Sequence, residues 1–206
     1  MANTAGKKID LIIKDDAGVP DNSKRLAQEL IVNEKVGVIG SALTPSAMAI
    51  GPLSTQGKTA NVVMVSGTSG VINPNNPYMV RTSFTLGQQS AIVGEWAAKN
   101  GSRKTVIVQS DWAPGAEAAN VFNDAFTKAG GQVVDTIKVP LQNPDFAPFI
   151  QRVKDAKPEA VFVFVPAGGQ GIAFMKAFQE RGLAQRMDRQ LMARGQSLPV
   201  AATATP

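Results

Sequence analysis

Residues 36–46 read VGVIGSALTPS, from Val36 to Ser46, an apolar run that stops at glycine and passes through hydroxyl residues into a helical pattern. We interpret this stretch as the carboxyl end of a parallel strand followed by a helix. In open α/β sheets, ligands bind outside the carboxyl ends of the strands, where the amino terminus of a helix offers unpaired N–H groups. Thr44 and Ser46 add hydroxyl groups at this position. The stretch therefore predicts a rim that can hold an anionic ligand.

The same alternation of short apolar strands and amphipathic helices extends in both directions from this stretch. Strands are expected at residues 9–13, 36–39, 61–65, 78–82, 105–108, 133–139 and 160–165, and the last of these has the continuous apolar character of a central parallel strand. The helices between them carry apolar residues at helical spacing, such as Ala119, Phe122 and Phe126, or Ile172, Met175 and Phe178. The alternation predicts an α/β fold with parallel sheets flanked by helices.

The pattern restarts after Phe84, which predicts a domain boundary there. We expect a partial N-terminal lobe at residues 1–85 and a partial C-terminal lobe at residues 86–183. From residue 184 the strand pattern ends, and residues 184–206 form a tail of mostly small residues that we expect to be disordered.

Composition restricts the chemistry. The chain has 206 residues, 44% of them hydrophobic and 18% charged, as in globular proteins, and it has neither cysteine nor histidine. It therefore lacks disulfides, thiol nucleophiles and the commonest general base and metal ligand, and we expect no enzyme activity, cofactor or metal site. The net charge of +5 is dispersed, which favours a solvated surface over a nucleic-acid interface.

Membrane and export signals are weak in the printed sequence. No apolar window is long enough for a spanning helix, and residues 1–8 lack the apolar core of a signal peptide.

Small and hydroxyl residues follow several of the expected strands. These loops cover residues 40–46, 66–70, 110–115 and 166–169. Each loop alone is typical of an ordinary turn between a strand and a helix. Their recurrence in both halves, with the large aromatic side chain of Trp112, favours a cleft between two domains that holds a small organic acid or amino acid.

Other chemistries receive less support. Asp15 and Asp16 could suggest a Mg²⁺ site, but a carboxylate pair without a third partner more often serves a loop or a helix cap. Neither glycine-rich phosphate-binding motif occurs, and a serine hydrolase would need a histidine. A doubly wound nucleotide-dependent enzyme is therefore the less favoured alternative.

A set of motifs makes a family resemblance specific. They are Gly6 to Leu11 leading to Asp15-Asp16, Gln28 to Ile31, Val36 to Ser46, Val80 to Thr85, Ser110 to Gly115, Asn143 to Phe146, and Phe162 to Gly168. Together they resemble the type I periplasmic binding proteins, and in particular the branched-chain amino acid (Leu/Ile/Val) branch. The similarity runs from about Gly6 to Leu183.

The resemblance implies two Rossmann-like lobes that capture a small carboxylate, such as a branched-chain or other amino acid, an amide or an aromatic acid. It also implies a periplasmic location, a membrane permease of an ABC importer as partner, and a monomer or weak dimer. A ligand-sensing receptor domain of the same fold is the alternative function.

The resemblance also implies ligand-binding residues. Thr44 matches a hydroxyl residue that holds the ligand, and Thr68, Ser69 and Gly70 match contacts from the following loop. Trp112 stands where the family usually has tyrosine, which favours stacking or shape selection, and Ala167 occupies a further contact position. Ser46 joins this set through its place in the first rim.

Two departures from the family pattern stand out. Family members begin with a strand and helix that precede Lys8, and that strand is central in its sheet; they also continue well beyond Leu183. The resemblance thus implies an incomplete fold, truncated at both ends, either as a fragment or through a frameshift near Ala184. We expect weak or no ligand binding and some aggregation, because an absent central strand exposes the edges of its neighbours.

Overall fold

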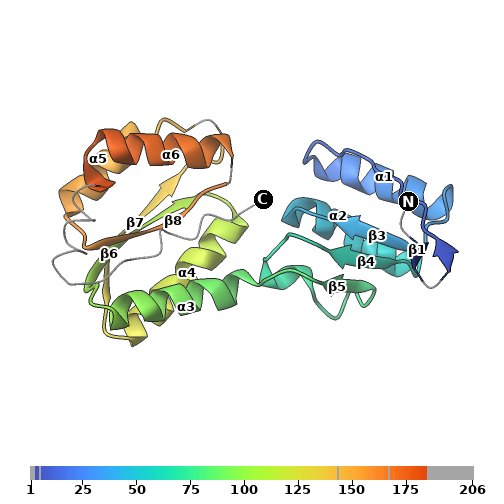
Figure 1. The fold of residues 1–206 in the computed structure, drawn as a ribbon, viewed down its shortest axis with the longest axis horizontal. Helices are drawn as coiled ribbons and strands as arrows, with labels where there is room; N and C mark the ends of the chain where they lie inside the picture. The colour runs from blue at the N-terminus through green and yellow to red at the C-terminus, as the bar shows by residue number, and fades with distance from the viewer. Residues whose placement is uncertain (1–2, 5, 143, 167, 185–206) are drawn as a thin grey trace. The chain divides into compact units, whose positions relative to one another are not determined.

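The computed structural model describes residues 3–4, 6–142, 144–166 and 168–184. The chain divides into two compact units (Figure 1): unit 1 contains Met1–Ser66 and Gly70–Ser83, and unit 2 contains Gly67–Ser69 and Phe84–Pro206. The main boundary, between Ser83 and Phe84, lies close to the boundary expected after residue 85. The inclusion of Gly67–Ser69 in unit 2 was not expected, and the chain therefore leaves unit 1 at Ser66 and returns to it at Gly70. The predicted tail lies outside the described residues.

Unit 1 is built on a parallel sheet of strand order β3-β4-β5. The elements are the hairpin strands β1 (Asn3–Thr4) and β2 (Lys7–Lys8), then α1 (Pro20–Val32), β3 (Val38–Ser41), α2 (Thr44–Gln56), β4 (Ala60–Val63), the 3-10 turn η1 (Ser69–Val71), and β5 (Met79–Arg81). In the register of the sheet, Gly40 pairs with Val62 and Val62 with Val80. The strand and helix predicted from residues 36–46 are thus confirmed as β3 and α2.

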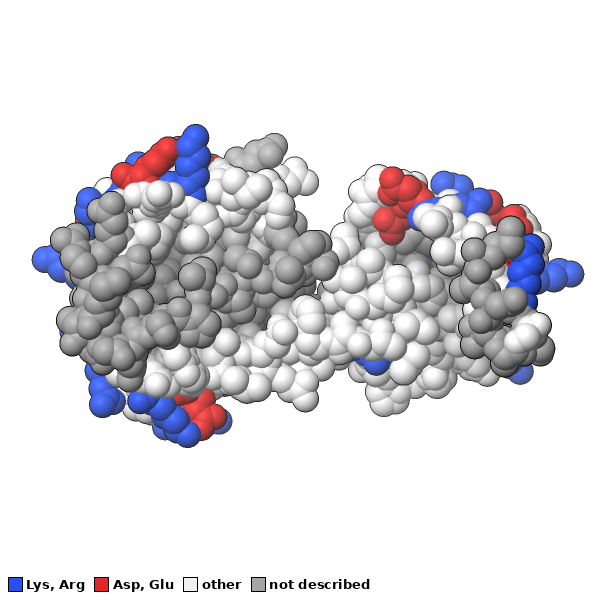
Figure 2. Space-filling view, in the orientation of Figure 1, with Lys and Arg blue, Asp and Glu red and all other residues white. Residues whose placement is uncertain are grey.

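Only one face of this sheet is covered by helices in the part of the chain that the structure describes. Helices α1 and α2 lie on the same side of β3–β5 (Figure 1), where Ile39, Ile50 and Val63 are buried. The opposite face exposes 60% of Val38 and 52% of Val80. Little charge lies over β4 and β5 in the view of Figure 2. Parallel sheets normally have both faces covered, so this face is unusually apolar for a solvent-exposed surface.

The strand predicted at residues 9–13 is wrong. No strand occurs there, and the side chains of Leu11 and Ile13 are 79% and 81% exposed. An apolar run becomes a strand only when a neighbouring strand accepts its backbone hydrogen bonds. No described strand pairs with residues 9–13, and β3 is an edge strand whose only described neighbour is β4.

Unit 2 is a parallel sheet of order β7-β6-β8 with helices on both faces. The elements are α3 (Leu86–Lys99), β6 (Lys104–Ser110), α4 (Ala113–Lys128), β7 (Gln132–Val139), α5 (Ala147–Ala156), β8 (Ala160–Phe164) and α6 (Gly169–Glu180). Helices α3 and α4 cover one face and α5 and α6 the other (Figure 1). No helix among the described residues is both long and apolar enough to span a membrane.

The central strand of unit 2 is β6, which corrects the expectation for residues 160–165. Every residue of β6 after Lys104 is buried, whereas β8 lies beside β6 at the edge of the described sheet. A continuous apolar run indicates that both faces of a strand are buried. A strand beside the central one can also be buried on both faces, so the run does not determine the order of the strands.

The core of unit 2 confirms the pattern predicted for α4. Ala119, Phe122 and Phe126 are buried, and the ring of Phe122 stacks on that of Phe162 with centroids 4.2 Å apart. The pattern predicted for α6 is only partly right, because Ile172 is 71% and Met175 44% exposed. Phe174 is buried instead, with its ring edge-on to Phe146. The helix carries two apolar stripes, and contact with the neighbouring core selects one of them.

Candidate functional site

Thr44 and Ser66 join two neighbouring strand ends in unit 1. Thr44 is the first residue of α2, three positions after the end of β3, and Ser66 lies three positions after the end of β4. Their hydroxyl oxygens lie 2.6 Å apart, and both residues are buried. Because β3 and β4 are parallel neighbours, their carboxyl ends meet at one edge of the sheet. The hydroxyl groups of Thr44 and Ser66 therefore lie together at this edge of the sheet, and a ligand contact there stays a prediction.

Ser46 is bound to a carboxylate. Its Oγ donates to Asp16 Oδ2 at 2.7 Å, and Ser23 Oγ lies 2.5 Å from the same oxygen. The backbone N–H of Gly18 donates to Asp16 Oδ1 at 2.8 Å. A serine has a single hydroxyl proton, so Ser46 has none left to donate to a ligand. The role of Ser46 as a ligand contact stays a prediction. In the structure its hydroxyl proton is used in the hydrogen bond to Asp16.

These hydrogen bonds determine the charge state of Asp16. The bonds from Ser23 and Ser46, followed by the backbone bond from Gly18, hold the pKa of the Asp16 carboxyl below its ordinary value. A charged Asp16 in turn strengthens the bonds that join the loop before α1 to the amino end of α2. The expected loop duty of the Asp15-Asp16 pair is thus what the structure shows.

The predicted contacts at residues 68–70 are divided between the units. Thr68 and Ser69 belong to unit 2, and Gly70 belongs to unit 1. The backbone N–H of Ser69 lies 3.1 and 3.2 Å from the two carboxylate oxygens of Glu117, and its hydroxyl donates to Oε1 at 2.5 Å. Gly70 accepts a hydrogen bond from the side-chain amide of Asn73 at 3.1 Å. Sequence reasoning missed Glu117, which lies 48 positions from Ser69.

Trp112 stands at the turn between β6 and α4, where it is the residue that precedes the helix. Its half-buried ring packs against the core under α3 and α4. The glycine of this turn is required by close packing, because a Cβ on Gly115 would overlap the carbonyl oxygen of Ser110. The loop that carries the predicted aromatic contact is therefore rigidly placed at the carboxyl end of the central strand.

Buried polar atoms without partners gather around this turn. Trp112 Nε1, Ser110 Oγ and Gln109 Oε1 are all buried and have no hydrogen-bond partner among the described residues. Ser110 is 0% and Gln109 4% exposed. Such groups are normally satisfied by water or a ligand, because leaving them unpaired costs free energy. Sequence reasoning placed Ser110 in the loop of residues 110–115 but named neither Ser110 nor Gln109 as a ligand contact, although a polar pair that ends an apolar strand is a usable signal.

The remaining predicted residue, Ala167, lies outside the described residues. No group of three or more potential metal ligands occurs in the described ranges.

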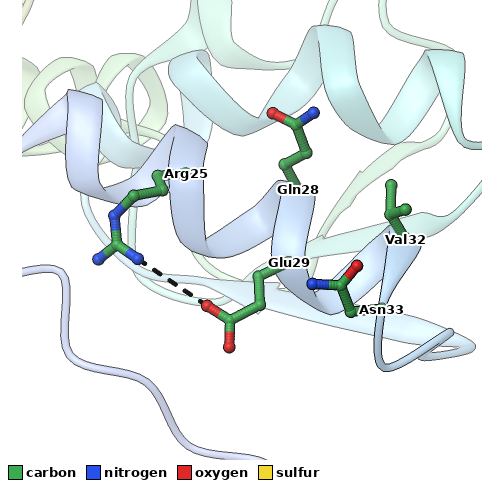
Figure 3. Close-up of a pocket in the computed structure, with 5 residues that line it drawn as sticks. All are labelled: Arg25, Gln28, Glu29, Val32 and Asn33. Atoms are coloured by element: carbon green, nitrogen blue, oxygen red, sulfur yellow. Dashed lines mark ion pairs between the residues drawn. The ribbon is translucent and has the colours of Figure 1, made fainter.

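Two surface depressions lie away from all of these residues. One runs along α1 (Figure 3), where Arg25 pairs with Glu29 at 3.9 Å and Gln28, Val32 and Asn33 complete the lining. The other lies between α3 and α4, lined partly by Glu95 and Lys128. Both are lined by the outer faces of helices and neither is at the carboxyl end of a strand, so neither matches the expected site.

Comparison with known proteins gives a consistent family. A sequence profile described as periplasmic binding protein matches residues 1–204. A curated relative from Brucella melitensis, named Leu/Ile/Val-binding protein homolog 6, is 46% identical over 165 residues, which is 80% of this chain and 42% of the relative.

Solved structures show the same relationship. A solute-binding protein of an ABC transporter from Rhodopseudomonas palustris BisB5, in complex with 3,4-dihydroxybenzoic acid, is 60% identical with a TM-score of 0.83, and the match covers 89% of this chain and 50% of that one. A second from Rhodopseudomonas palustris, in complex with 4-hydroxybenzoate, is 40% identical with a TM-score of 0.81 and covers 85% and 48%.

The chain thus spans about half the length of these relatives, between 42% and 50%. The predicted resemblance is confirmed by the profile, the curated relatives and the solved structures together. The chain belongs to the periplasmic binding protein family, and its two α/β units form part of the type I fold of ABC transporter solute-binding proteins.

Proposed function

We propose that this chain belongs to the solute-binding component of an ABC importer that captures a hydroxylated aromatic acid, such as 3,4-dihydroxybenzoate. It acts in the periplasm without catalysis and delivers its ligand to a membrane permease. The observation that carries the proposal is the 60% identity to a protein whose structure holds 3,4-dihydroxybenzoic acid. The match includes 89% of this chain and therefore both units.

The chemistry near Trp112 supports an aromatic ligand with ring hydroxyls. The indole supplies a flat apolar surface for an aromatic ring. Trp112 Nε1 and Ser110 Oγ lack a partner among the described residues but are covered by protein atoms, so they can pair with a phenolic oxygen only when the turn opens to admit the ligand. Within unit 1, the Thr44–Ser66 hydroxyl pair at a helix amino terminus suits a carboxylate.

The acidic residues near the predicted contacts argue against an ammonium group on the ligand. Asp16 accepts hydrogen bonds from Ser23 and Ser46, and Glu117 accepts from Ser69. Asp111, beside Trp112, pairs with Lys138 at 3.8 Å. The ammonium group of an amino acid would compete with the hydrogen bonds that Asp16 and Glu117 already accept, whereas a benzoate needs no carboxylate partner. Branched-chain amino acids are the second candidate, favoured by the Brucella relative, which is named a Leu/Ile/Val-binding protein homolog.

Calorimetric titration of the 206-residue chain separates these candidates. We expect 3,4-dihydroxybenzoate and 4-hydroxybenzoate to bind this partial chain weakly but more tightly than benzoate, because benzoate lacks phenolic groups that can pair with polar atoms of the protein. Leucine should bind more weakly than all three. A higher affinity for leucine, isoleucine or valine would favour the second candidate, and no binding of any of these compounds would refute the proposal for this chain.

The contribution of Trp112 is tested by Trp112→Phe, which keeps an aromatic ring and removes the indole N–H. We expect the affinity for 3,4-dihydroxybenzoate to fall about tenfold, the equivalent of one hydrogen bond and some ring contact. The matched control is Trp96→Phe on α3, which contacts the same core but is not at a strand end. Equal effects of the two substitutions on affinity would show that Trp112 acts only through packing.

A further inference from the structure

Ser69 and Glu117 form a compact set of hydrogen bonds within unit 2. Both donors of Ser69, the backbone N–H and the hydroxyl, point to the Glu117 carboxylate, at 3.1 and 3.2 Å for the N–H and 2.5 Å for the hydroxyl. Glu117 is half-buried near the start of α4, five positions after Trp112.

Further contacts hold the rest of this short segment. The carbonyl oxygen of Gly67 accepts a hydrogen bond from the N–H of Leu86 at 2.9 Å. A Cβ on Gly67 would lie 2.8 Å from the ring of Phe84, so only glycine fits without displacement. Ser69 Oγ lies 3.8 Å from the place where a Cβ on Gly87 would stand. Residues 67–69 therefore lie at the amino-terminal ends of α3 and α4.

The position of this segment in the chain makes the Glu117 contact important. Gly67–Ser69 belongs to unit 2, but the residues on both sides of it, Ser66 and Gly70, belong to unit 1. The segment has no helix or strand of its own beyond the 3-10 turn that begins at Ser69. Its place in unit 2 depends on side-chain and backbone contacts, and those between Ser69 and the Glu117 carboxylate are charge-assisted.

We propose that Glu117 is a positioning residue that holds segment 67–69 against α4, and so keeps Thr68 in a constant position relative to the turn that carries Trp112. The proposal rests on the proposed function, because Thr68 and Trp112 are predicted contacts of the ligand. Glu117 itself touches no ligand in this scheme. It acts through Ser69, and its two oxygens match the two donors of that residue.

The test uses the full 206-residue chain with four variants. Glu117→Gln keeps the size but replaces one acceptor oxygen by a donor, Ser69→Ala removes the hydroxyl, and Ser69→Thr retains it. The double variant of Glu117→Gln with Ser69→Ala measures the coupling between the two residues. Glu95→Gln is the control, because Glu95 is an exposed glutamate of α3 paired only with Lys99 among the described residues.

Two readouts are taken: hydrogen exchange of the Ser69 amide by NMR, and the dissociation rate and affinity of 3,4-dihydroxybenzoate. We expect Glu117→Gln to raise both the exchange rate and the dissociation rate by about tenfold, as for loss of a charge-assisted hydrogen bond. Ser69→Ala should have a smaller effect, Ser69→Thr should restore the original values, and Glu95→Gln should change neither.

The outcomes that contradict the proposal are distinct. Unchanged exchange at Ser69 in Glu117→Gln would show that Glu117 does not hold the segment. Faster exchange with unchanged ligand dissociation would reduce Glu117 to a purely structural role and overturn the proposal. A chain that binds none of the tested acids would overturn the proposed function, while the exchange measurement would still decide whether Glu117 holds segment 67–69.

Discussion

Asp16 shows how one carboxylate can connect separate segments of unit 1. It lies in the loop before α1, and its oxygens accept hydrogen bonds from Ser23 on α1, from Ser46 on α2 and from the backbone of Gly18. The contact with Ser46 spans 30 positions. Because Ser46 lies two residues after Thr44, Asp16 also fixes the helix start at which the predicted ligand contact stands.

The substitution Asp16→Asn should destabilise the chain by about 1–2 kcal/mol, because Asn offers one acceptor oxygen where two were used and brings a competing donor. Urea unfolding followed by far-UV circular dichroism measures the change. Asp15→Asn is the control, since among the described residues the Asp15 side chain accepts the N–H of Ala17 alone, in an exposed turn. If Asp15→Asn lowered the unfolding free energy as much as Asp16→Asn, the stabilising role of the Asp16 hydrogen bonds would be contradicted.

Asp16 should also make stability depend on acid pH. The folded-state pKa of its carboxyl is lowered from an ordinary value of 3.8, so its contribution is complete above that value and is lost as the pH falls through the folded pKa. The difference in unfolding free energy between the original chain and Asp16→Asn should thus be constant above about pH 4 and shrink below it. A difference that stays constant to the lowest pH at which the chain folds would contradict this.

At the scale of elements, the contact between α3 and α4 depends on glycine. A Cβ on Gly94 would lie 2.8 Å from the carbonyl oxygen of Phe122 and 3.1 Å from the backbone nitrogen of Phe126. Both atoms are backbone and cannot rotate away. The two helices therefore approach more closely than a side chain larger than hydrogen allows.

Gly94→Ala should destabilise unit 2 by about 1–3 kcal/mol, because the helices must separate to admit the methyl group. Gly87→Ala is the matched control on the same helix. Its Cβ would meet nothing closer than 3.8 Å, so the better helix propensity of alanine should leave stability unchanged or slightly raised. Thermal unfolding monitored by tryptophan fluorescence measures both, and equal effects would contradict the close-approach argument.

The elements differ in how well their sequence predicts their packing. The face of α4 follows from a single apolar stripe, which the sequence shows plainly. Residues 9–13 have the apolar content of a strand but not the partner that a strand needs, and α6 has more apolar positions than its neighbours can bury. Periodicity predicts what a segment can form, and the neighbouring segments decide what it buries.

At the scale of the whole molecule, the two units have separate hydrophobic cores that differ in how far helices cover the sheet. The unit 2 sheet has helices on both faces, whereas the described part of unit 1 covers one face of its sheet. Less buried apolar surface means less stabilisation. Unit 1 should therefore unfold at a lower denaturant concentration than unit 2.

Both tryptophans, Trp96 and Trp112, lie in unit 2, so their fluorescence reports that unit alone. We expect the far-UV circular dichroism signal to begin to change at lower urea than the fluorescence signal, in contrast to a two-state transition. Val63→Ala, in the unit 1 core, should lower the unfolding free energy of unit 1 by about 2 kcal/mol and move only the early circular dichroism change to lower urea. Val108→Ala, in the unit 2 core, should move the fluorescence transition to lower urea. Coincident transitions in all three chains would refute independent unfolding.

The sequence by itself determined the alternation of strands and helices, the stretch from Val36 to Ser46 as β3 and the start of α2, and the family. These properties depend on local periodicity and on residues close together in the chain. Tertiary structure alone decided that β6 is central, that Ser46 donates to Asp16, and that Ser69 lies on Glu117. The last two partners lie 30 and 48 positions away, and a hydroxyl pairs with whichever acceptor the fold brings within about 3 Å. The sequence pattern around a serine does not show which distant residue the fold brings into contact with it.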